Sequence, residues 1–217
     1  MTRRMGSVLE LKHITKVFNA GTVNEKVALD DLSLTLNDGD FVTVIGGNGA
    51  GKSTMLNAVA GAFYVDRGDI LIDGTDITRL PEYKRAKFIG RVFQDPMTGT
   101  AADMWIEENM ALAMKRGGRR GFRWAIRSRD RDEYKKQLRE LDLGLEDRLS
   151  TKVGLLSGGQ RQAITLLMAT MKRPKILLLD EHTAALDPKT AAKVLSLSEK
   201  IIAEEGLTAM MVTHNMK

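Results

Sequence analysis

The sequence predicts an α/β protein in which helices flank a mostly parallel sheet, with an antiparallel β subdomain at the N-terminus and an α-helical subdomain inserted mid-chain. Strand-like segments alternate with helix-like segments at both ends of the chain, the arrangement that gives a parallel sheet. The first forty residues contain mainly strand signals. Residues 102–149 are polar and helix-like, without a convincing strand.

Composition limits the class of protein. The 217 residues suffice for one large domain or two small ones, and 43% hydrophobic with 28% charged residues is typical of soluble globular proteins. No apolar run approaches the roughly eighteen residues of a membrane span, and the N-terminus lacks the apolar segment of a signal peptide. The absence of cysteine excludes disulfides and thiolate metal sites. A cytosolic protein is the simplest expectation.

The first strands follow from a change of hydrophobic period. Leucines at 32, 34 and 36 alternate with polar residues, which predicts a half-buried strand, and residues 37–39 (NDG) predict a turn. Residues 41–45 (FVTVI) are an almost unbroken apolar and β-branched run, typical of a buried parallel strand. A glycine-rich loop follows, and a helix is expected to begin near Gly51.

The remaining elements alternate in the same way. Short strands are expected at 69–72 and 89–93, with a turn between them and helix-like sequence after Leu80. Near the C-terminus, strands are predicted at 176–179 and 207–213. The helix between these two should have Asp187 as its N-cap, Pro188 at its first position and Gly206 just past its end. We therefore assign 1–95 and 152–217 to the α/β core with its β subdomain, and 96–151 to the helical insertion.

The loop after the 41–45 strand has the spacing of a phosphate-binding loop. Residues 46–54 (GGNGAGKST) fit G-x-x-x-x-G-K-[ST] between a predicted strand and a predicted helix. Backbone N–H groups of such a loop face phosphate oxygens, a lysine reaches the β- and γ-phosphates, and a hydroxyl binds Mg²⁺. The competing interpretation is a glycine-rich turn with an incidental lysine, which the complete spacing disfavours. The expected nucleotide-binding residues are Gly46, Asn48, Gly49, Ala50, Gly51, Lys52, Ser53 and Thr54.

Two acidic residues end the apolar strand at 176–179. Asp180 and Glu181 would lie at its carboxyl end, where ligands bind in open α/β sheets. Asp180 is suited to hold Mg²⁺ through water, and Glu181 to polarise an attacking water. Alone, such a pair is more often a helix cap and a solvated turn, and the phosphate-binding loop is what favours the functional interpretation.

A second helix start also points at a negative ligand. Residues 156–160 (LSGGQ) precede a predicted helix, so that backbone N–H groups and the positive end of the helix dipole face outward. One small protein would then have two phosphate-binding helix starts about a hundred residues apart.

These motifs together resemble the ATP-binding cassette (ABC) ATPases over nearly the whole chain. The order matches: phosphate-binding loop, Gln94 in RVFQDP, LSGGQ, LLLDE at 177–181, ALD at 185–187 and VTH at 212–214. LSGGQ is the most specific element, because other phosphate-loop families lack it. The resemblance implies hydrolysis of ATP with Mg²⁺ as the cofactor.

In this family two subunits pair head to tail, and each ATP lies between one subunit's phosphate-binding loop and the other's LSGGQ. The resemblance therefore implies that Ser157, Gly158, Gly159 and Gln160 bind the nucleotide of a second copy. It further implies that Gln94 senses metal and water, so that the metal residues are Ser53, Gln94 and Asp180.

The resemblance also implies roles for four other residues. Glu181 and His214 join Gln94 as the catalytic group, with His214 at the γ-phosphate, while Asp187 couples the two sites and Phe18 stacks on adenine. Each role has an alternative: Ser157 and Asp187 are good N-caps, His214 could be an ordinary core or surface histidine, and Phe18 could simply pack.

The sequence departs from the family pattern twice. His182 stands where proline usually follows the acidic pair, which places a titratable group beside Glu181. The chain ends three residues after His214, whereas relatives normally continue with another strand and helix, so we expect the C-terminal end of the family fold to be missing.

The length of the helical insertion limits the kind of process that ATP hydrolysis by this protein could power. Gln94 and Ser157 are 63 positions apart, too few for the coiled-coil arms of chromosome-maintenance ATPases. In transporter cassettes this subdomain and the Gln94 loop receive a helix of a membrane-embedded partner. Methionines suit an adaptable docking surface, although they could equally fill the subdomain core. The residues concerned are Met97, Met104, Trp105, Met110 and Met114.

The net charge of +5 is concentrated in one segment. Residues 115–131 contain eight basic residues and one acidic residue. The segment could be a solvated helix face, could approach anionic lipid headgroups, or could bind nucleic acid with Phe122 and Trp124 stacking on bases.

We predict the ATPase subunit of a bacterial importer for an amino-acid-like solute, the last step resting on DEHTAALDP at 180–188. The implied partners are a second copy, transmembrane permease subunits and, through the complex, an extracytoplasmic solute-binding protein, with no nucleic acid. The protein would then be cytoplasmic and peripheral on the inner face of the cell membrane. The alternative is a cytosolic ABC ATPase acting on nucleic acid or ribosomes, a class that usually has two cassettes per chain. A regulatory module without turnover is disfavoured by Glu181.

Overall fold

The computed structural model describes residues 6–118 and 126–213, which form two units with separate hydrophobic cores. The described residues of the first unit are 6–90, 174–180 and 206–213, and those of the second are 91–118, 126–173 and 181–205. Over these residues, none of the helices combines the length and apolar character that crossing a membrane would require.

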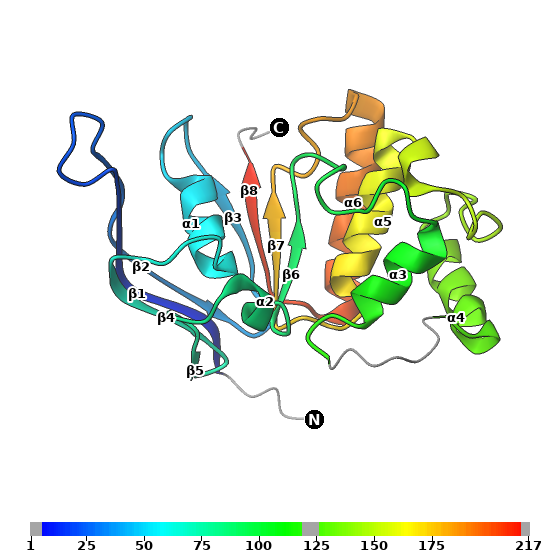
Figure 1. The fold of residues 1–217 in the computed structure, drawn as a ribbon, viewed down its shortest axis with the longest axis horizontal. Coiled ribbons are helices and arrows are strands. Elements are labelled where there is room, and N and C mark those ends of the chain that lie inside the picture. Colours follow the sequence, from blue (N-terminus) through cyan, green and yellow to red (C-terminus); the bar gives the residue numbers. More distant parts are fainter. Residues whose placement is uncertain (1–5, 119–125, 214–217) are drawn as a thin grey trace. The chain divides into compact units, whose positions relative to one another are not determined.

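The first unit contains the predicted antiparallel β subdomain (Figure 1). Leu11 pairs with Leu34 and Leu9 pairs with Ile72, so apolar side chains of three strands enter one core. The alternation predicted around residue 34 is observed, with the leucines more buried than the polar residues between them. In spatial order the strands are β2 (Lys26–Asn37), β1 (Ser7–Phe18), β4 (Arg67–Ile72) and β5 (Thr75–Asp76).

A second sheet has the order β3-β8-β7-β6, and the strands that follow the two nucleotide motifs belong to it (Figure 1). Its β3–β8 and β8–β7 pairs are parallel, with Val44 opposite Val212 and Leu178 opposite Met210. These non-consecutive neighbours require crossover connections, as predicted from the alternation of strands and helices. The strands are β3 (Phe41–Ile45), β8 (Ala209–Thr213), β7 (Ile176–Asp180) and β6 (Ile89–Val92).

The prediction of a buried parallel strand at 41–45 was correct in the parallel pairing and wrong in the burial. β3 is parallel, but the side chains of Phe41 and Ile45 are 41% and 51% exposed. Among the described residues β3 pairs with β8 alone, so it is an edge strand, whereas the four leading residues of β7 are fully buried.

The C-terminal end of helix α1 (Lys52–Ala60) is buried, and a buried arginine donates hydrogen bonds to its carbonyls. Gly61 terminates the helix in the left-handed conformation. Arg85, at the end of the short helix α2 (Glu82–Arg85), is 1% exposed and donates to the carbonyls of Ala58 and Val59 at 2.7 and 2.9 Å. These bonds supply donors to carbonyls of the last turn, of which that of Ala58 also accepts from the N–H of Gly61 at 3.3 Å, and a cation there complements the helix dipole.

The second unit is mainly helical and contains, beside the segment 96–151, helices that the sequence analysis assigned to the α/β core (Figure 1). A bidentate ion pair joins α3 to α4: Arg131 Nε and Nη2 lie 2.6 and 3.0 Å from the carboxylate of the buried Glu107. The capped helix predicted after Asp187 is α6, and Gly206 follows it with a φ of 61°. The helices are α3 (Ile106–Met114), α4 (Ser128–Arg139), the 3₁₀ turn η1 (Val153–Leu155), α5 (Gly158–Thr170) and α6 (Pro188–Glu205).

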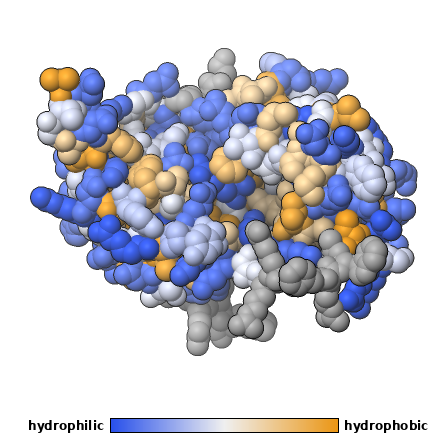
Figure 2. Space-filling view, in the orientation of Figure 1, coloured by the Kyte–Doolittle hydropathy of each residue, from blue (hydrophilic) through white to orange (hydrophobic). Residues whose placement is uncertain are grey.

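The methionines predicted to cluster after Gln94 divide between surface and core. Met110 is fully buried in the core of the second unit, whereas Met97, Trp105 and Met114 are 47%, 43% and 38% exposed. On the face shown in Figure 2, hydrophobic residues reach the surface in small groups among hydrophilic ones.

Candidate functional site

The phosphate-binding loop has the backbone that its glycines predict. Gly49 and Gly51 both have a φ of 82°, in the left-handed region that favours glycine. A Cβ on Gly51 would lie 2.5 Å from the carbonyl oxygen of Ala28, so any larger residue would displace strand β2. Gly51 is also the N-cap of α1, whose first residue is Lys52.

Lys52 is held inside this loop. Its side chain is almost buried, at 7% exposure, and its Nζ donates to the carbonyls of Gly46 and Gly47 at 2.6 and 3.0 Å. The ammonium group therefore lies within the loop whose N–H groups suit phosphate oxygens, and a phosphate there would meet a positive charge.

Ser53 and Asp180 come together in the first unit although 127 positions separate them. Strand β7 ends at Asp180, whose Oδ1 lies 3.2 Å from Ser53 Oγ. A hydroxyl and a carboxylate are hard oxygen donors, the kind that Mg²⁺ prefers, and Mg²⁺ characteristically takes few protein ligands beside phosphate and water. The donor set thus fits the predicted metal.

The residue after Asp180 has an unusual backbone. Glu181 has a φ of 45°, and its carbonyl accepts from the N–H of Ala184 at 2.9 Å. A non-glycine residue in this region stores roughly 1–3 kcal/mol of strain, and such residues concentrate at functional sites. The tight turn places Glu181 directly after the carboxyl end of β7.

The histidine beside Glu181 is a buried structural residue. His182 is 1% exposed, and its Nε2 lies 2.9 Å from Ser198 Oγ, which in turn donates to the Val194 carbonyl at 2.8 Å. The ring must therefore be the donor to Ser198. Burial lowers the pKa of His182 from 6.5 to about 4, so the ring is neutral at physiological pH. The titratable group that the sequence places beside Glu181 therefore carries no charge in that range.

This burial predicts an acid-sensitive contribution to stability. Because the folded pKa lies below the unfolded value, the unfolded chain binds the proton first as pH falls. The contribution of the neutral His182 to the free energy of unfolding is fully present above pH 6.5. It decreases by roughly 3 kcal/mol as the pH falls to about 4.

Urea unfolding of the parent and of His182→Asn at several pH values measures this contribution. The difference between the two proteins should shrink steadily from pH 7 to pH 4. His13→Asn is the matched control, because His13 is an exposed histidine that lies outside this buried cluster. If the unfolding free energies of the parent and of His182→Asn changed in parallel with pH, this would contradict the assignment of His182 as a buried, neutral residue.

The LSGGQ segment is a capped helix start. Ser157 is the N-cap of α5: its Oγ accepts from the N–H of Gln160 at 3.3 Å, and Gln160 Oε1 accepts from the N–H of Ser157 at 3.2 Å. The capping interpretation is thereby confirmed. These two bonds leave other N–H groups of the first turn at the positive end of a 13-residue helix.

Asp187 is likewise confirmed as a cap. Its Oδ1 accepts from the backbone N–H of Thr190 at 3.1 Å in the first turn of α6. The Thr190 hydroxyl and this backbone N–H hold the pKa of Asp187 below its ordinary value.

Gln94 is exposed just after β6, and the residue that holds its segment in place was not predicted. The fully buried Gln162, on α5, donates from Nε2 to the carbonyl of Phe93 at 2.9 Å. Its Oε1 has no hydrogen-bond partner among the described residues. The Gln94 segment and the helix that begins at LSGGQ are thus joined within the second unit. Gln162 directly precedes the mainly apolar run 163–169, and a polar residue at that position was the sequence signal that could have identified it.

Phe18 packs on another aromatic ring. The centroids of Phe18 and Phe63 are 5.2 Å apart in an edge-to-face arrangement, and Lys16 Nζ lies 5.4 Å from the Phe18 centroid. The packing alternative is therefore correct, and Phe18 as a whole residue is only partly buried. His214 lies outside the described residues.

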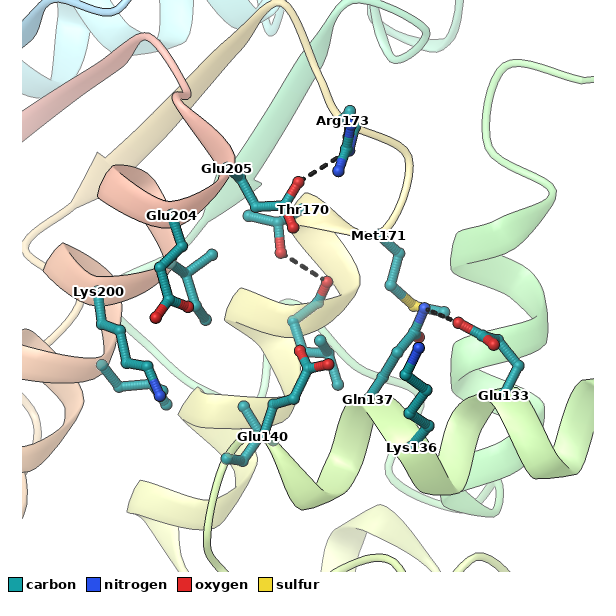
Figure 3. A pocket seen from close by; sticks show the side chains of 14 residues that line it. Glu133, Lys136, Gln137, Glu140, Thr170, Met171, Arg173, Lys200, Glu204 and Glu205 are labelled. Carbon is teal, nitrogen blue, oxygen red and sulfur yellow. Dashed lines mark hydrogen bonds and ion pairs between the residues drawn. The ribbon is translucent and has the colours of Figure 1, made fainter.

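A cavity of about 340 Å³ in the second unit is lined by none of these residues (Figure 3). It lies between α4, α5 and α6, with Leu167 and Ile201 among its apolar lining and ion-paired or hydrogen-bonded groups around it. Arg173 Nε lies 2.8 Å from Glu205, and Gln137 donates to Glu133 at 3.2 Å. The nucleotide motifs are elsewhere on the chain.

Comparison with known proteins matches residues 29–184 to the ABC transporter family. The tyrosine transport ATP-binding protein of Clostridioides difficile is 43% identical over 97% of this chain and 83% of its own length. A methionine import ATP-binding protein of Corynebacterium efficiens is 36% identical over 98% of this chain, which spans only 57% of that protein.

Solved structures agree in fold. The ADP conformation of an ATP-binding cassette of an ABC transporter superposes with a TM-score of 0.79 at 28% identity, covering 98% of this chain and 83% of that one. A dimeric cassette in a post-hydrolysis state, bound to ADP and phosphate, has a TM-score of 0.78 at 31% identity, covering 96% and 88% of the two chains.

Proposed function

This chain belongs to the ABC transporter family of ATP-binding proteins, and we propose that it binds and hydrolyses ATP to power a membrane importer of an amino-acid-like solute. The observation that carries the proposal is the phosphate-binding loop with Lys52 inside it and Ser53 Oγ 3.2 Å from Asp180. The solute class is supported by relatives named for tyrosine transport and methionine import.

The first unit would hold the triphosphate. Backbone N–H groups of residues 46–54 surround it, Lys52 neutralises its terminal charge, and Phe18 offers a ring face to adenine. Ser53 and Asp180, with Gln94, would hold Mg²⁺, which when bound neutralises charge on the phosphates.

The chemical step needs a water held in line with the γ-phosphate. Glu181, directly after the metal-binding Asp180, is the residue we assign to orient and polarise that water. Gln94 would contact the metal and the water, and His214 would contact the γ-phosphate; each lies on a separate segment of the chain.

A second copy would complete the site. The start of α5, at Ser157–Gln160, would face the partner's γ-phosphate, with Asp187 coupling the two sites. The capped helix N-terminus is suited to an anion, and the resemblance to solved cassettes described as dimeric supports a head-to-tail pair.

The permease contact would lie on the second unit, on a surface that we call the α3 surface, comprising Trp105 and Leu112. These side chains are 43% and 53% exposed, and Met97 and Met114 are further exposed methionines of the same unit. Trp105 and Leu112 also line a cavity of about 300 Å³, which the Glu107–Arg131 ion pair borders. An apolar surface beside the Gln94 segment suits an amphipathic helix of a membrane-embedded subunit. That subunit would hold the protein at the inner face of the membrane and connect it to an extracytoplasmic solute-binding protein.

Trp105→Ala tests this contact. Removing a half-exposed indole should weaken assembly with the membrane subunits by roughly tenfold or more, since aromatic residues dominate interface energies, while nucleotide affinity stays unchanged. Co-purification with the permease subunits of its transporter, from detergent extracts, measures this assembly. Tyr83→Ala is the control, because Tyr83 is an exposed aromatic residue of the first unit, at 72% exposure against 43% for Trp105. Unchanged recovery of Trp105→Ala would remove the α3 surface from the interface.

The alternative, action on nucleic acid or ribosomes, depends on the basic segment 115–131, of which residues 119–125 lie outside the described part of the chain. Nucleic-acid binding by the isolated protein distinguishes this alternative from the importer function. Binding of DNA or RNA at physiological salt that is lost on neutralising Arg119, Arg120 and Arg123 would favour this alternative.

A further inference from the structure

The first turns of α5 and α6 pack against each other without space for one additional methyl group. A Cβ built on Gly159 would overlap the Cγ2 methyl of Thr190, and the Thr190 Cβ would lie 3.6 Å away. One position earlier, a Cβ on Gly158 would be 3.2 Å from a Leu186 methyl. Both glycines of LSGGQ therefore contact, within the same unit, the segment that contains Asp187.

Thr190 has two neighbours that restrict its side chain. Its backbone N–H donates to Asp187 Oδ1 at 3.1 Å, and the Thr190 hydroxyl helps to hold the pKa of that carboxyl below its ordinary value. A β-branched side chain has few rotamers in a helix, so a hydroxyl directed at Asp187 determines where the methyl points. The methyl lies against Gly159.

We propose that Thr190 is a positioning residue that sets the distance between the LSGGQ helix start and the Asp187 turn, so that the two move together. The proposal rests on the proposed function, in which LSGGQ binds the partner's nucleotide. It adds a second reason for glycine at position 159: this residue must be small for its own subunit's α6, and not only for the approach of a phosphate.

The test removes either the glycine or the methyl group. Gly159→Ala introduces the Cβ; Thr190→Ser removes the methyl and keeps the hydroxyl; Thr190→Val keeps the methyl and removes the hydroxyl. All are made in a Glu181→Gln background, and the Mg-ATP-dependent dimer is followed by size-exclusion chromatography with light scattering and by thermal unfolding.

Gly159→Ala should weaken the ATP-dependent dimer by roughly tenfold or more, the scale expected of overpacking. Adding Thr190→Ser should restore the dimer to near the parent level and raise the unfolding temperature again. Adding Thr190→Val should restore neither. Rescue by serine but not by valine is a result that a general loss of packing would not produce.

Three outcomes would overturn the proposal. Gly159→Ala could dimerise as well as the parent, the double variant with Thr190→Ser could fold but fail to dimerise, or neither variant could fold. If the Glu181→Gln parent itself forms no ATP-dependent dimer, the proposed function fails instead, and the unfolding temperatures alone then decide whether Thr190 and Gly159 are coupled.

Discussion

Replacing Lys52 with alanine is expected to abolish ATP binding and turnover while leaving the fold intact. The Nζ of Lys52 is the cation inside the phosphate-binding loop, in contact with the carbonyls of Gly46 and Gly47. Loss of a charge-assisted bond to phosphate costs about 3 kcal/mol, so nucleotide affinity should fall on the order of 100-fold or more.

Titration with a fluorescent ATP analogue, steady-state ATPase activity and far-UV circular dichroism measure these effects. Lys175→Ala is the matched control, because Lys175 is a half-exposed lysine paired with Asp73 and lies outside the loop. Near-normal ATPase activity of Lys52→Ala would refute the assignment of this loop to the triphosphate.

Glu181→Gln is expected to keep ATP binding while slowing hydrolysis by about 10²–10⁴-fold, the scale of a lost general base. Glutamine has nearly the same shape but cannot accept a proton from the attacking water. ATP would then persist between two copies, and a dimer that normally separates after turnover would remain.

Adding Ser157→Arg to Glu181→Gln tests the other wall of the same site. A bulky cation at the N-terminus of α5 would occupy the interface, and it would also be unfavourable at the positive end of the helix dipole. The dimer should be lost although each phosphate-binding loop still binds ATP. Ser157→Thr keeps a capping hydroxyl and should keep the dimer, which separates interface effects from the loss of the cap.

Light scattering with and without Mg-ATP on the single and double variants reports the result. An ATP-dependent dimer that survives Ser157→Arg would mean that LSGGQ in this chain is a capped helix start and no more.

Several parts of the fold and of the candidate site were predictable because they depend on neighbours a few positions away. The left-handed glycines 49 and 51, the capping box of Ser157 and Gln160, and the Asp187 cap before Pro188 are local features of this kind. The apolar run that becomes β7 also predicted where Asp180 would be. The sequence by itself therefore determined the helix starts near residues 52, 158 and 188, the strand at 176–179 and the motifs that lie there, whereas the bounds of the helices within 102–149 were not predicted.

Only the tertiary structure decided which side chains are covered. The apolar runs at 41–45 and 176–179 look alike in sequence, yet β3 lies at a sheet edge and β7 between two strands, so only β7 is buried. His182, Gln162 and the Gly159–Thr190 contact each depend on residues that are distant in the chain. Burial and long-range pairing depend on which elements pack together, and periodicity carries no information on that choice.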